Sequence, residues 1–94
     1  TTGYDYETMT LPESIEDQPR TCLATIAKAL GEAGSSTADV VRVNYFISDR
    51  SYVETVFPIV GEVFGDVRPA ATMVACQLNE EAMKIEIEVT AYKA

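Results

Sequence analysis

The chain has 94 residues, enough for two packed layers around one core but too few for two independent domains, so we predict a single domain over residues 1–94. Its net charge of -8, with seven basic residues scattered singly, argues against a nucleic-acid partner, and no apolar run reaches the length of a membrane span. His is absent, which removes the commonest general base and leaves no Ser-His or Cys-His pair and no zinc site. Cys22 and Cys76 lack metal-type spacing and lie in apolar segments, which indicates buried thiols in a reduced, cytoplasmic protein.

The first half of the chain predicts a strand followed by a helix. Thr1–Thr10 is rich in Thr and Tyr, the composition of a strand or extended arm. Ser14, with Asp17 three residues later, resembles a capping box, although Pro19 would also allow the regular helix to begin at Asp17. Gly34 is expected to end this helix as a left-handed cap.

A second strand and helix follow. Residues 40–47 alternate well, and one face of this predicted strand carries Val41, Val43, Tyr45 and Ile47. Apolar residues then recur at helical spacing over Tyr52–Phe64, with Ser51 as the predicted N-cap. Pro58 removes a backbone hydrogen bond in the middle of this helix and is expected to kink it.

The stretch Arg68–Tyr92 predicts a β-hairpin, because two alternating runs are joined by the polar residues 79–81. In the second run, residues 83, 85, 87, 89 and 91 are apolar and share one face. Glu86 and Glu88 project side by side from the other face, which makes them the first candidates for chemistry.

These elements predict an α+β fold with two helices on one face of a mixed sheet. The second face would remain uncovered, and it is too apolar for a solvated surface and too polar for a core. We therefore expect it to be hidden against copies of the same chain. The predicted members of this open face are Arg42, Asn44, Phe46, Met73, Ala75, Gln77, Glu86, Glu88 and Thr90.

Four features occur in order along the chain: the Val40 strand, the helix end Val63-Phe64-Gly65, the turn Arg68-Pro69-Ala70 and the run Lys84-Ile85-Glu86-Ile87-Glu88-Val89. In this order and spacing they resemble the RidA family, also called YjgF or endoribonuclease L-PSP proteins. The resemblance extends from Thr2-Gly3 to Tyr92 and does not include the family's N-terminal hairpin. It implies a chorismate-mutase-like fold, a homotrimer, and small-molecule clefts between subunits.

The resemblance also implies a chemistry. RidA-type proteins hydrolyse enamines and imines derived from amino acids, as 2-iminobutanoate/2-iminopropanoate deaminases, and use no metal or bound cofactor. The family's catalytic glutamate falls on Glu86, and its Ser-Gly pair falls on Thr2-Gly3. The Arg that anchors the substrate carboxylate is replaced by Ala71, which places the chain in a branch without that anchor. A family Cys corresponds to Met73 and a cleft Asn to Phe57.

Other residues near these positions have two interpretations each. Tyr4 and Tyr6 beside Gly3 either line the cleft or are half-buried strand aromatics. Arg68 either substitutes for the missing anchor or lies on the surface. Backbone groups near Ala71 and Thr72 would orient a bound substrate.

The remaining candidate residues also have purely structural interpretations. Glu86 is either catalytic or part of a solvated face, and Glu88 is structural. Cys76 is expected to share the helix-covered face with Val74 and Leu78, which argues against a nucleophilic role.

Three functions are compatible with this pattern. The first is hydrolysis of an imine, enamine or related small electrophile, with Glu86 acting as acid or base on water. The second is a trimeric ligand-binding or protein-stabilising module without catalysis. The third, ribonuclease activity, is the weakest because the chain has neither His nor a basic stripe.

Overall fold

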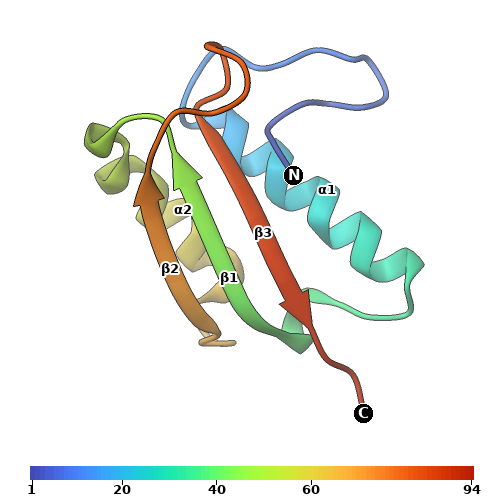
Figure 1. Cartoon of the computed structure of the whole chain (residues 1–94). Helices are drawn as coiled ribbons and strands as arrows, with labels where there is room; N and C mark the ends of the chain where they lie inside the picture. Colours follow the sequence, from blue (N-terminus) through green and yellow to red (C-terminus); the bar gives the residue numbers. More distant parts are fainter.

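The structure, a computed structural model, describes residues 1–94 and consists of a three-stranded sheet with two α-helices on one of its faces (Figure 1). The elements in chain order are α1 (Asp17–Glu32), β1 (Val40–Ile47), α2 (Val53–Phe64), β2 (Ala70–Ala75) and β3 (Ile85–Ala91), with 3-10 turns at Thr37–Asp39 and Arg50–Tyr52. This arrangement confirms the predicted α+β class with two helices on one face of a mixed sheet.

β1 is the central strand: β2 pairs with it in parallel on one side, and β3 pairs with it antiparallel on the other. The predicted hairpin over Arg68–Tyr92 is therefore wrong, because β2 and β3 do not pair with each other. The helix α2 returns the chain from the end of β1 to the start of β2, and a helical crossover of this kind produces a parallel neighbour. The connection over residues 76–84 then passes the end of β1, where the Ser48 amide donates to the Lys84 carbonyl at 3.1 Å.

The register between β1 and β3 decides which side chains face the helices. Tyr45 lies beside Ile87 and Ile47 beside Ile85, and all four are buried. The predicted faces of β3 are thereby confirmed, with the apolar residues inward. Val41 is an exception: a register shift between Val40 and Arg42 buries Val40 and leaves Val41 51% exposed, so its assignment to the buried face is wrong.

The register of β2 corrects a second assignment. Met73 lies beside Tyr45, and Val74 lies beside Phe46, so Met73 and Ala75 are on the helix-covered face while Val74 is on the open face. The sequence predicts the opposite for all three. The run Ala70–Ala75 contains too many small residues to show a clear apolar phase, which explains the error.

The ends of α1 follow local sequence signals. The Ser14 hydroxyl oxygen accepts a hydrogen bond from the Asp17 amide at 3.0 Å, and the helix begins at Asp17. After the helix, Gly34 has a φ of 77°, and the Ser35 amide donates to the Leu30 carbonyl at 2.8 Å. The predicted left-handed cap at Gly34 is confirmed.

The start of α2 differs from the prediction. The Asp49 carboxylate, rather than the Ser51 hydroxyl, caps this segment, because it accepts a hydrogen bond from the Ser51 amide at 2.8 Å ahead of the Arg50–Tyr52 turn. That bond holds the pKa of Asp49 below its ordinary value. Pro58 lies inside α2, and the kink expected there stays a prediction.

The segment Thr1–Thr10 is not a strand. Only two isolated bridges occur, one between Thr2 and Glu86 and one between Asp5 and Thr10. The Asp5 carboxylate accepts hydrogen bonds from two following amides, which folds the chain back on itself and prevents an extended run. Its beginning nevertheless pairs with β3, because the Ile87 amide donates to the Thr1 carbonyl at 2.8 Å.

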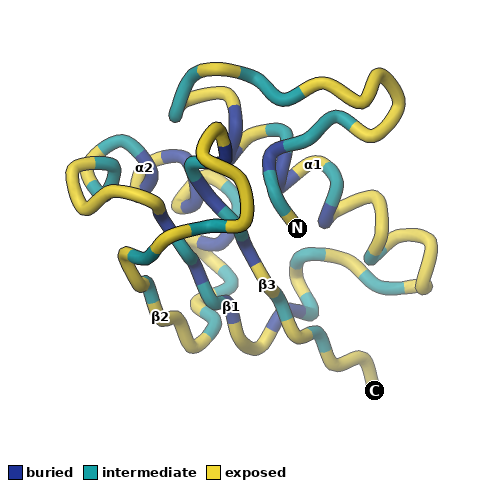
Figure 2. Tube along the Cα trace, turned by 45° about the horizontal axis from the view of Figure 1, so that its top comes forward, coloured by how far each residue is buried: buried dark blue, intermediate teal, exposed yellow.

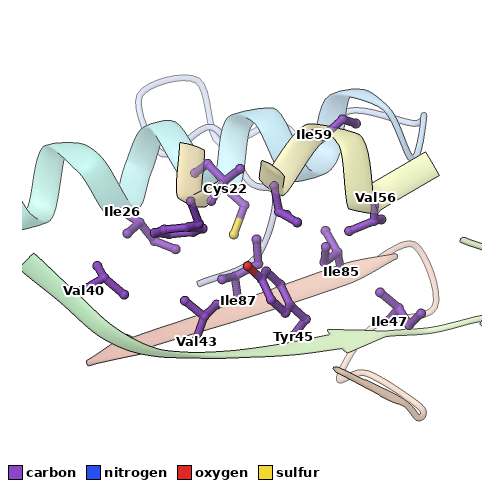
Figure 3. Close-up of a cluster of buried hydrophobic side chains, with 13 residues drawn as sticks. Cys22, Ile26, Val40, Val43, Tyr45, Ile47, Val56, Ile59, Ile85 and Ile87 are labelled. Carbon is purple, nitrogen blue, oxygen red and sulfur yellow. The ribbon is translucent and has the colours of Figure 1, made fainter. Parts of the chain in front are cut away.

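The core lies between the helices and the sheet and contains 13 buried side chains (Figure 3). Buried residues alternate with less buried ones along β1 and at the start of β3, whereas β2 is largely exposed (Figure 2). Cys22 points toward the sheet in this core and is fully buried, while Cys76 is only half-buried. Burial raises the pKa of the Cys22 thiol to about 12. Neither helix is long and apolar enough to cross a membrane.

Candidate functional site

Glu86 lies on the open face of the sheet, beside Phe46 of β1. Its side chain is 42% exposed and its carboxylate accepts no hydrogen bond, although an oxygen lies 3.9 Å from the Thr1 nitrogen. A hollow of about 340 Å³ opens next to it, at the outer edge of β3 and against Leu30 of α1. Apart from this long ion pair, the carboxylate has no partner in the chain and is accessible to a bound molecule.

Glu88 lines the same hollow as Glu86, but its carboxylate accepts a side-chain hydrogen bond and that of Glu86 does not. The Asn44 side-chain amide donates to Glu88 at 2.9 Å, across the paired strands β1 and β3. Two carboxylates that alternate on one strand thus differ in their contacts. Glu86 is the better candidate for chemistry, and Glu88 is the better candidate for a structural role.

The Thr1–Pro12 arm holds the other residues predicted near Glu86. Gly3 is buried against α1, and a Cβ added there would lie 2.7 Å from the Gln18 Cβ. The Tyr4 hydroxyl donates to Glu80 at 2.8 Å, which raises the pKa of Tyr4, and its ring stacks on Tyr6 with 6.5 Å between centroids. The requirement for glycine at position 3 is therefore steric, and Tyr4 ties the arm to the loop after β2.

Gln18 is the residue that fixes this region, and it is not among the residues predicted to form the site. Its side chain is fully buried, and its Nε2 donates to the carbonyls of Pro12 at 2.8 Å and Ala82 at 2.9 Å. Its Oε1 accepts from the Lys84 amide at 2.8 Å. One side chain thereby joins the arm, α1 and the start of β3, two residues before Glu86.

A second group of predicted residues lies at the outer edge of β2. Phe57 and Met73 border a hollow of about 310 Å³, which we call the β2–α2 hollow; its lining consists of Ile47, Arg50, Val53, Phe57, Met73 and Ala75. Thr72 is exposed on the same strand. Arg68 is exposed, has a φ of 54° and lines neither the β2–α2 hollow nor the hollow beside Glu86.

One chain does not bring these two groups together. Ala71 lies beside Val43 on the helix-covered face of β2, whereas Glu86 lies beside Phe46 on the open face of β3. The strand β1 separates them, as Figure 1 shows. A site that uses both groups would need two copies of the chain. No group of three or more Cys, Asp or Glu side chains is placed to hold a metal ion.

The fold and the two groups of residues define a small α+β protein whose helices cover one face of a β2-β1-β3 sheet. The model of the family Endoribonuclease L-PSP matches residues 1–93. The chain belongs to this family, which includes proteins named RidA and YjgF.

Relatives support the same membership. The mitochondrial protein Mmf1 of Schizosaccharomyces pombe is 38% identical over 81 residues, which cover 83% of this chain and 50% of that protein. A RutC family protein of Pyrococcus horikoshii is 34% identical over 79 residues, covering 84% of this chain and 63% of the relative. The chain thus spans about half to two thirds of the length of these relatives.

Solved structures of the family share the fold. A Mycobacterium tuberculosis member of the YjgF/YER057c/UK114 family superposes with a TM-score of 0.88 at 35% identity and covers 99% of this chain and 74% of its own. RidA from the Antarctic bacterium Psychrobacter sp. PAMC 21119 gives a TM-score of 0.92 at 27% identity, and the match covers 99% of this chain and 76% of that RidA chain. TdcF of Escherichia coli, solved with bound serine, is 23% identical and shares the fold with a TM-score of 0.91.

Proposed function

We propose that this protein binds small molecules in clefts between copies of the chain and hydrolyses imines or enamines there, with Glu86 as the acid or base. The observation that supports this most is the separation of the family's cleft positions into two groups on opposite edges of the sheet. A neighbouring copy would bring the β2 edge of one chain to the Glu86 face of another.

The open face of the sheet supports self-association, which we propose to produce a homotrimer. No helix covers this face, and it mixes apolar and polar side chains, including Phe46, Val74 and the Asn44–Glu88 pair. Val74 is 42% exposed in the single chain. Burying such a face against another copy removes apolar surface from water while polar pairs fix the register.

The proposed reaction replaces a C=N bond by a C=O bond. An enamine first becomes an imine as a proton leaves its nitrogen and another is added at its terminal carbon. The Glu86 carboxylate accepts a proton from water as the water oxygen attacks the imine carbon, and the imine nitrogen takes up a proton from solvent, which gives a carbinolamine. Glu86 gives its proton to the amino nitrogen, the C–N bond breaks with release of ammonia, and the hydroxyl group loses its proton to solvent as the C=O bond of the 2-keto acid forms. Every hydrogen comes from the substrate or from water, and no metal or cofactor takes part.

The direct test is release of ammonia and pyruvate from 2-aminoacrylate generated in solution. Glu86→Gln is expected to lower turnover by at least about 100-fold, because general acid–base groups contribute factors of this size. Glu88→Gln is the matched control, since it makes the same change on the same strand to a carboxylate already bound by Asn44. Equal loss in both variants would refute the role of Glu86.

A non-catalytic, ligand-binding or protein-stabilising role is the second candidate, and Ala71 favours it. Ala cannot make the two charge-assisted bonds by which Arg holds a carboxylate. We expect activity well below that of an Arg-containing relative, and Ala71→Arg to raise it. Saturable binding without turnover, unchanged in Glu86→Gln, would establish this alternative.

Ribonuclease activity is the least favoured function, because the chain combines a net charge of -8 with no His. Labelled RNA incubated at moderate salt should remain intact. Cleavage that disappears in Glu86→Ala would overturn this expectation.

We also propose that residues 1–94 act as one domain and that the protein is cytoplasmic. Because the fission yeast relative is named mitochondrial, imaging of the tagged full-length protein is the relevant check.

A further inference from the structure

Arg50 lines the β2–α2 hollow together with Phe57 and Met73, two of the positions that correspond to the family's cleft. It lies in the Arg50–Tyr52 turn after β1 and is not among the site residues predicted from the sequence. The other lining residues are apolar, so Arg50 is the one charged residue at this hollow. Ala71, the position that corresponds to the family's anchoring Arg, lies on the same strand two residues before Met73 but does not line the hollow.

Arg50 is also available for a ligand. Among the seven basic residues, Arg20 and Lys28 form ion pairs, Arg42 donates to Thr90, and Lys84 lies over the Tyr52 ring. The other three, Arg50, Arg68 and Lys93, have no such partner, and among them only Arg50 lines the β2–α2 hollow.

Neighbouring carboxylates leave Arg50 free as well. Asp49 precedes it, but its carboxylate accepts from the Ser51 amide. Glu54, one helical turn further on, forms no ion pair with it. An unpaired guanidinium is a strong donor for a carboxylate, because two parallel N–H groups match its two oxygens.

We propose that Arg50 anchors the carboxylate of a small ligand whose apolar group lies against Phe57 and Met73. A hollow of about 310 Å³ is at the lower end of the range for ligand sites, which suits a small, branched 2-keto acid or imino acid. The choice of a carboxylate-bearing ligand rests on the proposed function; the position of the cation rests on the structure alone.

Methionine methyl groups provide a site-specific test. The chain contains three methionines: Met73 in the hollow, Met9 in the exposed arm and Met83 in a buried position. Protein labelled with ¹³C at the methionine methyls is titrated with 4-methyl-2-oxopentanoate and, separately, with its uncharged methyl ester. The acid is expected to shift the Met73 signal saturably and leave Met9 and Met83 in place, and the ester is expected to bind at least about tenfold more weakly.

Substitutions then assign the anchor. Arg50→Gln is expected to weaken binding of the acid by at least about tenfold, Arg50→Lys by less, and Arg68→Gln, the matched control, not at all. Unchanged Met83 and Met9 signals show that each variant is folded. Equal affinity of wild type and Arg50→Gln, equal binding of acid and ester, or a silent Met73 would each overturn the inference.

The outcome is separable from that of the proposed reaction. If the acid binds through Arg50 but 2-aminoacrylate is not hydrolysed, the anchor stands and the hydrolysis fails. If hydrolysis depends on Glu86 while Arg50→Gln leaves KM unchanged, the hydrolysis stands and the anchor fails.

Discussion

Replacing Gln18 by Leu is predicted to destabilise the protein more than any other polar-to-apolar change of similar size. The substitution keeps the volume of the side chain but removes three hydrogen bonds of 2.8 to 2.9 Å, to Pro12, Ala82 and Lys84. Each such bond contributes about 1 kcal/mol net, and an unpartnered buried group costs about 1–3 kcal/mol. Water can reach the carbonyl of Ala82, an exposed residue, so we expect the loss at the lower end, about 3 kcal/mol in total.

Urea unfolding at one fixed protein concentration measures this loss. With an m-value of about 2 kcal/mol/M, 3 kcal/mol lowers the midpoint by about 1.5 M without a change in slope. Gln77→Leu makes the identical change at the chain's other Gln, which is exposed and has no side-chain hydrogen bond, and should alter stability by less than about 0.5 kcal/mol. A loss below about 1 kcal/mol for Gln18→Leu at unchanged slope would refute the central role of this side chain.

Two further predictions concern packing and pH. Gly3→Ala should destabilise the protein by about 1–3 kcal/mol, because the new Cβ would lie 2.9 Å from the Gln18 carbonyl oxygen. Gly31→Ala is the control: Gly31 lies in α1 with open space around it, so the change should be neutral or stabilising. Thermal unfolding midpoints that fall equally in both variants would contradict this prediction. Burial raises the pKa of Cys22 from 9.0 and of Tyr45 from 10.0 to about 12 each, so the folded state holds these protons more tightly than the unfolded state. The stabilisation from these two groups is therefore fully present below pH 9 and should be lost between pH 9 and 12, by up to about 1.4 kcal/mol per pH unit for each group. The stability of Cys22→Ala should fall less steeply with pH over this range, and an equal slope would exclude Cys22 as a contributor.

Local features of the fold could be predicted because each depends on a few neighbouring residues. The helix start at Asp17 follows from the turn in which the Asp17 amide donates to the Ser14 hydroxyl, and the left-handed Gly34 follows from the absence of a Cβ. Strand pairing could not be predicted in the same way, because it depends on contacts between distant segments. The strand–helix–strand order from Val40 to Ala75 did contain the relevant signal, since a helical crossover favours a parallel neighbour and leaves β3 to pair on the other side of β1.

The candidate site was predictable to a similar extent. Glu86 faces the open side as predicted, because β3 alternates without a bulge. Met73 faces the helices, and the sequence did not predict this because the small residues of β2 give no clear apolar phase. Gln18 could have been found as a polar residue on the stripe it shares with Cys22 and Ile26 at four-residue spacing. The sequence did not predict that Arg50 and Met73 line the same hollow, because this depends on the parallel pairing of β1 and β2.

The mass of the protein in solution tests most directly whether its site is shared between copies. Light scattering coupled to size exclusion is expected to give about three times the chain mass of 10.3 kDa, independent of dilution in the micromolar range. Substituting Val74 by Asp on the open face should shift the mass toward that of one chain, because it buries a charge in the contact. A wild-type protein that remains at 10.3 kDa at every concentration would contradict a cleft formed by the β2 edge of one copy and Glu86 of another.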